Sequence, residues 1–198
     1  MGNILNIIME LSLGFRYSLA LVRGAIMSKR DAYLFYEAGQ AVAAAHLGLT
    51  IRHVSGNPAL LASEIVFPRN QPKARMILWL TGMAAEKKAV GRSDPLRRTR
   101  NRLRLRSLLE SVSAEMVGPA ARRRADARTL VNQAQDRANA ICNGLYLAIN
   151  QVAALLSENE SITGEQVKAV VDAIKAQRSR DAAPPVDPFQ VSENKQDM

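Results

Sequence analysis

The stretch DAYLFYEAGQAVAAAHLG, residues 31–48, decides the fold of this chain of 198 residues. Its apolar residues recur three and four positions apart, which is the spacing of one face of an α-helix; they include Leu34, Ala38, Ala41, Val42 and Ala45. Gly48 then supplies a C-terminal stop signal. The sequence therefore predicts a helix over 31–47 with one side turned to a hydrophobic core.

Two short strands and four further helices are predicted downstream of this helix. Segments 51–55 and 64–67 are rich in β-branched and aromatic residues, which favours a two-stranded β-ribbon. Apolar spacing, Gly and Pro signals, and a capping box at 163–166 predict helices over 72–90, 95–116, 120–156 as one continuous helix, and 163–176. The alternation of Arg and Leu over 102–106 also fits a strand. The predicted fold class is mainly α with a small two-stranded β-ribbon.

Three regions are predicted along the chain: an apolar or amphipathic extension (1–28), one domain (29–178) and a disordered tail (179–198). Glu10, Arg16 and Arg23 interrupt the extension before it reaches the length of a membrane span. Residues 1–26 either form an amphipathic helix, packed on the domain or on a membrane surface, or precede a natural start at Met27. The single cysteine fits a reducing compartment, so we expect a cytoplasmic protein, peripheral at a membrane if residues 1–26 bind there.

The positive charge is concentrated in one window of the chain. The net charge is +9, and residues 87–106 alone hold nine basic residues and one acid. Candidate anion-binding residues in the predicted helix are Arg97, Arg98, Arg100, Arg102, Arg104 and Arg106. A solvated helix face, an acidic protein or anionic membrane, and nucleic acid all fit this pattern. The absence of aromatic residues over 80–145 leaves no stacking platform for single-stranded nucleic acid.

Three stretches, taken in order, resemble the peptidase domain of the FtsH family of ATP-dependent zinc metalloproteases. Residues 36–42, YEAGQAV, are similar to the family's His-Glu-Ala-Gly-His-Ala helix, and a short strand follows them. Residues 80–86, LTGMAAE, are similar to its Gly-Gly-Arg-Ala-Ala-Glu-Glu segment. Residues 127–158 and the capping box at 163–166 resemble its closing helices. The resemblance implies an FtsH peptidase-like helical domain.

The chain departs from the family where the resemblance places the metal. The family's two histidine ligands fall on Tyr36 and Gln40, its general base on Glu37, and its third ligand on Asp94. A neutral phenol and an amide oxygen are poor ligands for zinc. We therefore expect Tyr36 and Gln40 to hydrogen-bond each other and Glu37 to be a degenerate general base. Asp94 also reads as a helix cap in front of Pro95.

The leading hypothesis is a stand-alone pseudo-peptidase of FtsH-like fold that binds or regulates protein without hydrolysing it. One alternative is an active zinc metalloendopeptidase that works with a separate ATPase partner. Another is a binder of anionic surfaces or nucleic acid through residues 87–106. No glycine is followed by lysine, so the chain carries no phosphate-binding loop and no ATP site.

No cofactor is predicted, and zinc enters only through the resemblance. The expected partners are a protein or unfolded peptide, a second copy of the chain, or a separate ATPase subunit. A nucleic acid or an anionic membrane is the expected partner of the basic helix.

Overall fold

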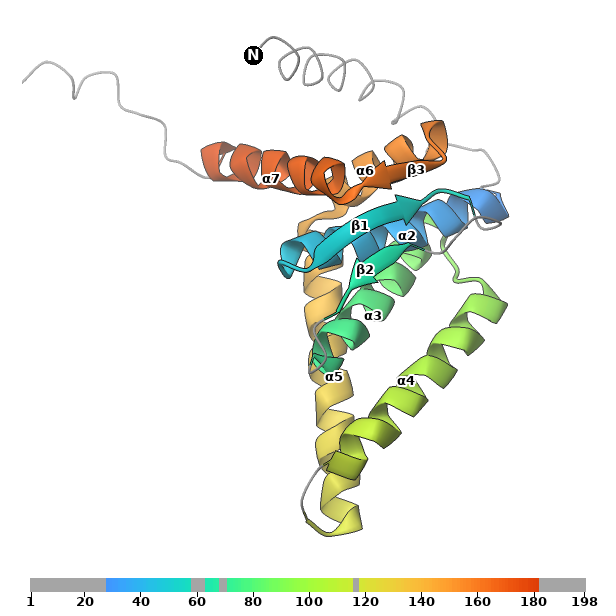
Figure 1. The fold of residues 1–198 in the computed structure, drawn as a ribbon, viewed down its shortest axis with the longest axis vertical. Coiled ribbons are helices and arrows are strands. Elements are labelled where there is room, and N and C mark those ends of the chain that lie inside the picture. Colours follow the sequence, from blue (N-terminus) through green and yellow to red (C-terminus); the bar gives the residue numbers. More distant parts are fainter. Residues whose placement is uncertain (1–27, 58–62, 68–70, 116–117, 182–198) are drawn as a thin grey trace, which may run out of the picture.

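The computed structural model describes residues 28–57, 63–67, 71–115 and 118–181. Within these residues the protein is mainly α, with six helices and a small antiparallel sheet (Figure 1). The elements follow the order α2 (Lys29–His46), β1 (Thr50–Ser55), β2 (Glu64–Val66), α3 (Pro72–Val90), α4 (Pro95–Glu115), α5 (Ala120–Gly144), α6 (Tyr146–Glu158), β3 (Ser161–Thr163) and α7 (Gly164–Asp181). The predictions for the N-terminal extension up to residue 27 and for the tail beyond residue 181 lie outside the described residues.

Helix α2 is the centre of the fold, and the helix predicted over residues 31–47 is confirmed. It begins with a capping box, in which the Ser28 hydroxyl accepts from the Asp31 amide at 3.2 Å and Asp31 accepts from the Ser28 amide at 2.8 Å. Its buried residues include Ala41, Val42, Ala43 and Ala44 in succession, so the helix is enclosed on all sides and not on the one side that the sequence predicts. The chain leaves the helix through Gly48, whose φ of 72° favours glycine. The packing of α3, α6, α7 and the sheet around α2 completes a single core (Figure 1).

Helix α3 packs closely against α2 because glycines occupy the contact. A Cβ atom built at Gly39 of α2 would lie 2.7 Å from the Ala85 Cβ and 3.0 Å from the Gly82 Cα of α3. A Cβ built at Gly82 would lie 2.8 Å from the Tyr36 carbonyl oxygen. The two backbones approach within a distance that only glycine permits. The first two stretches of the resemblance therefore form one tight helix pair.

The sheet has three strands in the order β2-β1-β3, where the sequence predicts two. Strand β1 pairs antiparallel with β2 through Ile51 and Ile65, and with β3 through Val54 and Ile162. The prediction missed β3 because three residues are too few to show alternation. Its last residue, Thr163, is also the cap of the next helix. Thr163 accepts from the Gln166 amide at 3.3 Å and donates its own amide to Gln166 at 2.8 Å, which confirms the predicted capping box.

The prediction of one continuous helix over 120–156 is wrong. The chain breaks at Leu145, and α5 and α6 meet at 75°. The break lets two apolar faces pack in different directions, because α5 lies against α3 whereas α6 lies against α2. Gly144, inside the apolar run, is the sequence signal for this break.

The structure decides two further predictions, namely the conformation of residues 95–115 and the end of the last helix. Residues 95–115 form helix α4, so the strand alternative for the Arg-Leu alternation is wrong. Helix α7 runs to Asp181, beyond the predicted end near residue 176, so the first residues assigned to the tail are helical. Its buried side chains include Val167, Val171 and Ile174, which pack into the core.

Membrane-spanning character is weak in the part of the chain that the structure describes. No single helix there has both the length and the apolar content to cross a bilayer, and a bent pair (Ala125–Gly144 with Tyr146–Glu158) meets those criteria only in combination.

Candidate functional site

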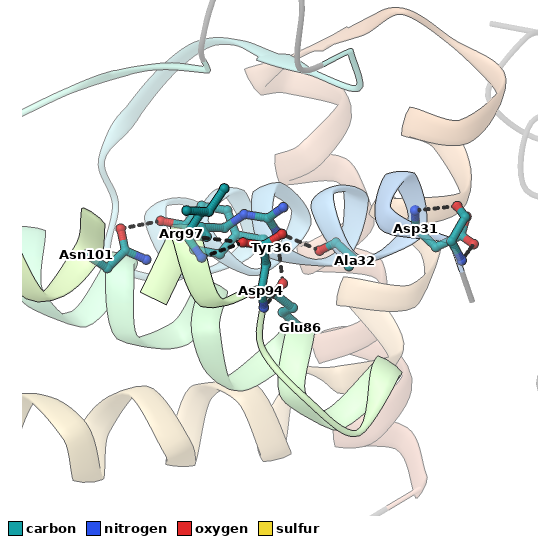
Figure 2. Close-up of polar contacts among 9 residues, drawn as sticks. Asp31, Ala32, Tyr36, Glu86, Asp94, Arg97 and Asn101 are labelled. Carbon is teal, nitrogen blue, oxygen red and sulfur yellow. Dashed lines mark hydrogen bonds and ion pairs between the residues drawn. The ribbon is translucent and has the colours of Figure 1, made fainter. Parts of the chain in front are cut away.

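Tyr36 is buried on α2, and its hydroxyl donates a hydrogen bond to Oδ1 of Asn101 on α4 at 3.0 Å (Figure 2). Asn101 is fully buried. Burial raises the pKa of Tyr36 to about 12, so the phenol is neutral at physiological pH. The hydroxyl thus joins α2 to α4, and the expected hydrogen bond between Tyr36 and Gln40 is replaced by this one.

Glu37 is also buried, although a carboxylate is costly to remove from water. Its carboxylate accepts a hydrogen bond from the hydroxyl of Ser63, which directly precedes β2. Burial raises the pKa of Glu37, while the Ser63 hydrogen bond and the positive charges of Arg97 and Arg104 act in the opposite direction. Glu37 is therefore a carboxyl group of α2 with an elevated pKa, hydrogen-bonded to the residue that precedes β2.

Gln40 lies beside Gly82 of α3. A Cβ atom built at Gly82 would be 3.0 Å from the Gln40 Cγ and from Cδ2 of the Tyr36 ring. Both positions to which the resemblance assigns zinc ligands thus pack over the same glycine. The Tyr36 and Gln40 side chains therefore pack in the interface between α2 and α3.

Asp94 caps helix α4, as one of its two interpretations predicts. Its Oδ1 accepts from the Leu96 amide at 2.8 Å and from the Arg97 amide at 3.0 Å. These backbone hydrogen bonds, that from Arg97 foremost, lower the pKa of Asp94. The Asp94 amide in turn donates to Oε1 of Glu86 at 2.9 Å (Figure 2).

Arg97 belongs to the interior of the fold and differs in this from the other candidate anion-binding residues. Its guanidinium donates to Oε1 of the fully buried Glu86 and to the Ala32 carbonyl oxygen, both at 3.1 Å (Figure 2). Its Cζ atom also lies 5.4 Å from the centroid of the Tyr33 ring and 5.0 Å from the centroid of the Tyr36 ring, within the range of cation–π contacts. The remaining arginines predicted on this helix are exposed, namely Arg98, Arg100, Arg102, Arg104 and Arg106.

The polar cluster between α2, α3 and α4 consists of Tyr36, Glu86, Arg97 and Asn101. Among the described residues, Nδ2 of Asn101 and Oε2 of Glu86 find no hydrogen-bond partner. Burial raises the pKa of Glu86, and the bond from the Asp94 amide and the charge of Arg97 oppose this rise. The hydrogen bonds of the cluster connect the three helices in a buried environment, where each bond is stronger than in water.

The side chains at the positions to which the resemblance assigns zinc ligands do not fit a zinc ion. The Tyr36 hydroxyl is neutral and engaged with Asn101, and Oδ1 of Asp94 holds two backbone amides. The two histidines lie elsewhere: Nε2 of His46 is 3.4 Å from Arg137, and His53 is on β1 beside Glu64. No group of three or more His, Cys, Asp or Glu side chains in the described ranges is arranged to hold a metal ion.

Sequence reasoning missed Ser63, Glu86 and Asn101. Glu86 stands within the second resembling stretch, where the sequence pattern gives no sign of its burial. Asn101 interrupts a run of Arg and Leu, and an amide in such a run is the signal that would have suggested a buried partner. Nothing in the local sequence indicates that Ser63 contacts Glu37.

No protein-family model matches the chain, and no curated protein matches it. The fold and the polar cluster define the described part as a mainly α protein of six helices with a small three-stranded antiparallel sheet.

Proposed function

We propose that this chain is an FtsH-like pseudo-peptidase, a peptidase-type fold that binds protein segments and does not hydrolyse them. The observation that carries the proposal is the hydrogen bond from Tyr36 to the buried Asn101. It occupies a position that the resemblance gives to a metal-binding histidine. A side chain fixed in this way serves the packing of α4 and is withdrawn from coordination.

The chemistry of peptide hydrolysis supports the same proposal. Zinc lowers the pKa of bound water from 15.7 to about 7, which lets a carboxylate take its proton. Glu37 is present, but its carboxylate is buried and accepts from Ser63. In the part of the chain that the structure describes, no group of zinc ligands lies beside Glu37, which leaves it without a water acidic enough to activate.

An edge strand gives the proposed binding function a physical basis. Strand β2 lies at one edge of the described sheet, with Val66 39% exposed. An extended peptide can add to such an edge through main-chain hydrogen bonds, and apolar side chains beside it contribute affinity. Main-chain hydrogen bonds do not depend on the side chains of the peptide, so this edge could bind unfolded segments of different sequence.

Purified protein tests the catalytic half of the proposal. We expect less than stoichiometric zinc by elemental analysis and no cleavage of unfolded casein at micromolar protein. Cleavage that a chelator abolishes would overturn the proposal. So would stoichiometric zinc that is lost in the Asp94→Ala variant.

A binding measurement tests the other half. We expect unfolded casein to bind, and the Val66→Asp substitution to weaken that binding at the sheet edge. Leu147→Asp is the matched control, because Leu147 is 40% exposed but lies on α6. Failure of the wild-type protein to bind unfolded casein, or equal weakening by both substitutions, would contradict the proposal.

A further inference from the structure

Helix α4 has a buried side and an outward side of different chemistry. Asn101 is fully buried, and Leu105, Leu108 and Leu109 pack partly buried against the core. On the outward side, Leu96 is 79% exposed and Leu103 is 62% exposed. Figure 1 shows α4 running along the outside of the fold from the end of α3 to the start of α5.

The two exposed leucines form one line with arginines on its flanks. Leu96 and Leu103 are seven residues apart, two helical turns, so they point in nearly the same direction. Arg100 lies one turn from each of them, and Arg102 and Arg106 lie beyond the opposite flank. We define the outward face of α4 as Leu96, Arg100, Arg102, Leu103 and Arg106, all exposed.

This face combines two exposed leucines with positive charge, so a ligand that matches it must offer both apolar groups and negative charge. Acidic charge on the same helix is confined to Glu110, which pairs with Arg106 at 2.9 Å, and to Glu115 at its end. This exposed pair is weak and engages only one arginine, so Arg100 and Arg102 leave the face positively charged. Lipid headgroups complement the arginines, and the acyl boundary below them accepts the leucines.

A second observation lies at the beginning of α4. Arg97 binds the Ala32 carbonyl at 3.1 Å, so the first turn of α4 contacts the first turns of α2. The 27 residues that enter the fold at Ser28 carry only three charged residues, Glu10, Arg16 and Arg23. A segment poor in charge therefore joins the fold next to the end of α4 that holds Leu96.

We propose that the outward face of α4 docks on an anionic lipid surface, with Leu96 and Leu103 entering the headgroup region and the arginines binding lipid phosphates. A nucleic acid would satisfy the arginines, but its phosphate backbone offers nothing to two exposed leucines. The lipid surface accounts for both residue types. This inference is independent of the proposed pseudo-peptidase function.

The full-length chain and vesicles of defined composition test the proposal. We expect co-sedimentation with vesicles of phosphatidylcholine and phosphatidylglycerol in equal parts, and much weaker binding to phosphatidylcholine alone. Arg100→Ala with Arg102→Ala should weaken binding about 25-fold, since each arginine near the surface contributes roughly fivefold. Leu96→Asn and Leu103→Asn should each weaken it roughly tenfold.

Matched substitutions on other elements serve as controls. Arg128→Ala with Arg180→Ala removes the same charge from exposed positions on α5 and α7, and Leu147→Asn removes an exposed leucine from α6. We expect both controls to bind within about twofold of the wild type, because surface substitutions away from the face change little. Circular dichroism and urea midpoints should show every variant folded.

Three results would overturn the proposal. Equal binding to both kinds of vesicle would show that anionic charge is not recognised. Vesicle binding that the α4 variants leave unchanged would place the contact elsewhere in the chain. Absence of vesicle binding, with duplex DNA binding that the arginine substitutions reduce and the leucine substitutions leave intact, would identify a phosphate polymer as the partner.

Discussion

The Arg97 guanidinium lies 3.1 Å from the carboxylate of Glu86, and this ion pair joins the first turn of α4 to α3 inside the protein. Glu86 is fully buried and Arg97 is only 16% exposed at its side chain. Removing one partner of such a pair leaves an uncompensated buried charge. This destabilises the fold more than replacing both partners with apolar residues of similar size.

We therefore expect Arg97→Ala to lower the free energy of unfolding by about 3 to 5 kcal/mol. Arg98→Ala is the matched control, because Arg98 is the next residue and is exposed; its effect should stay within about 0.5 kcal/mol. Urea denaturation of both variants measures the difference. Equal stability of the two variants would mean that the pair contributes nothing.

The hydrogen bond between Tyr36 and Asn101 predicts a coupling that a double-mutant cycle can measure. Tyr36→Phe leaves the buried Asn101 amide without its donor, so we expect a loss of about 1 to 3 kcal/mol. Asn101→Leu in the Tyr36→Phe background should remove much of that loss, because both polar partners are then gone. Strictly additive effects in urea denaturation would refute the coupling.

The buried Glu37 predicts how stability changes with pH. Burial raises its pKa in the folded protein above the value of about 4.3 expected in the unfolded chain. The native state then binds the proton more tightly, so this group stabilises most at low pH and its contribution falls as the pH rises above about 4.3. Glu86 acts in the same direction.

Glu37→Gln should therefore raise stability near neutral pH and flatten the decline that begins as the pH rises above about 4.3. Urea midpoints at several pH values measure this. Glu158→Gln, at an exposed position of α6, is the control and should follow the wild-type curve. A Glu37→Gln profile that is parallel to the wild-type profile would contradict a raised pKa for this carboxyl.

The close contact of α2 and α3 predicts opposite outcomes for two glycines. Gly39→Ala would place a Cβ atom 2.7 Å from the Ala85 Cβ, and we expect a loss of about 1 to 3 kcal/mol from overpacking. At Gly144 the nearest atom to a built Cβ is Nη1 of Arg178 at 3.8 Å, an ordinary contact. Gly144→Ala should be neutral or slightly stabilising in thermal denaturation. Equal effects would argue against the tight helix pair.

Much of the helical framework could be predicted from local sequence. Apolar spacing identified α2 and α3, and hydrogen-bonding side chains identified the starts of α4 and α7 at Asp94 and Thr163. Each of these signals lies within a few residues of the feature that it reports. The α5–α6 break was missed because the apolar run continues through Gly144.

The polar cluster could be predicted only in part, because its partners are distant in sequence. Tyr36 and Glu37 were singled out from their motif, but Asn101 is 65 residues from Tyr36, and Ser63 is 26 residues from Glu37. The same limit applies to Arg97. In the sequence it is one of several arginines in a basic run, but its guanidinium is turned inward and pairs with Glu86. Which arginine is buried depends on the packing of α4, and local pattern does not contain that information.

The sheet joins parts of the chain that are made at very different times. His53 of β1 pairs with Thr163 of β3, more than a hundred residues later. During synthesis β1 therefore leaves the ribosome long before its second neighbour exists, and that side stays open to other nascent chains or to a chaperone. Premature termination upstream of Ser161 would leave this edge permanently unpaired, so truncated products should be cleared or aggregate while the full-length chain folds.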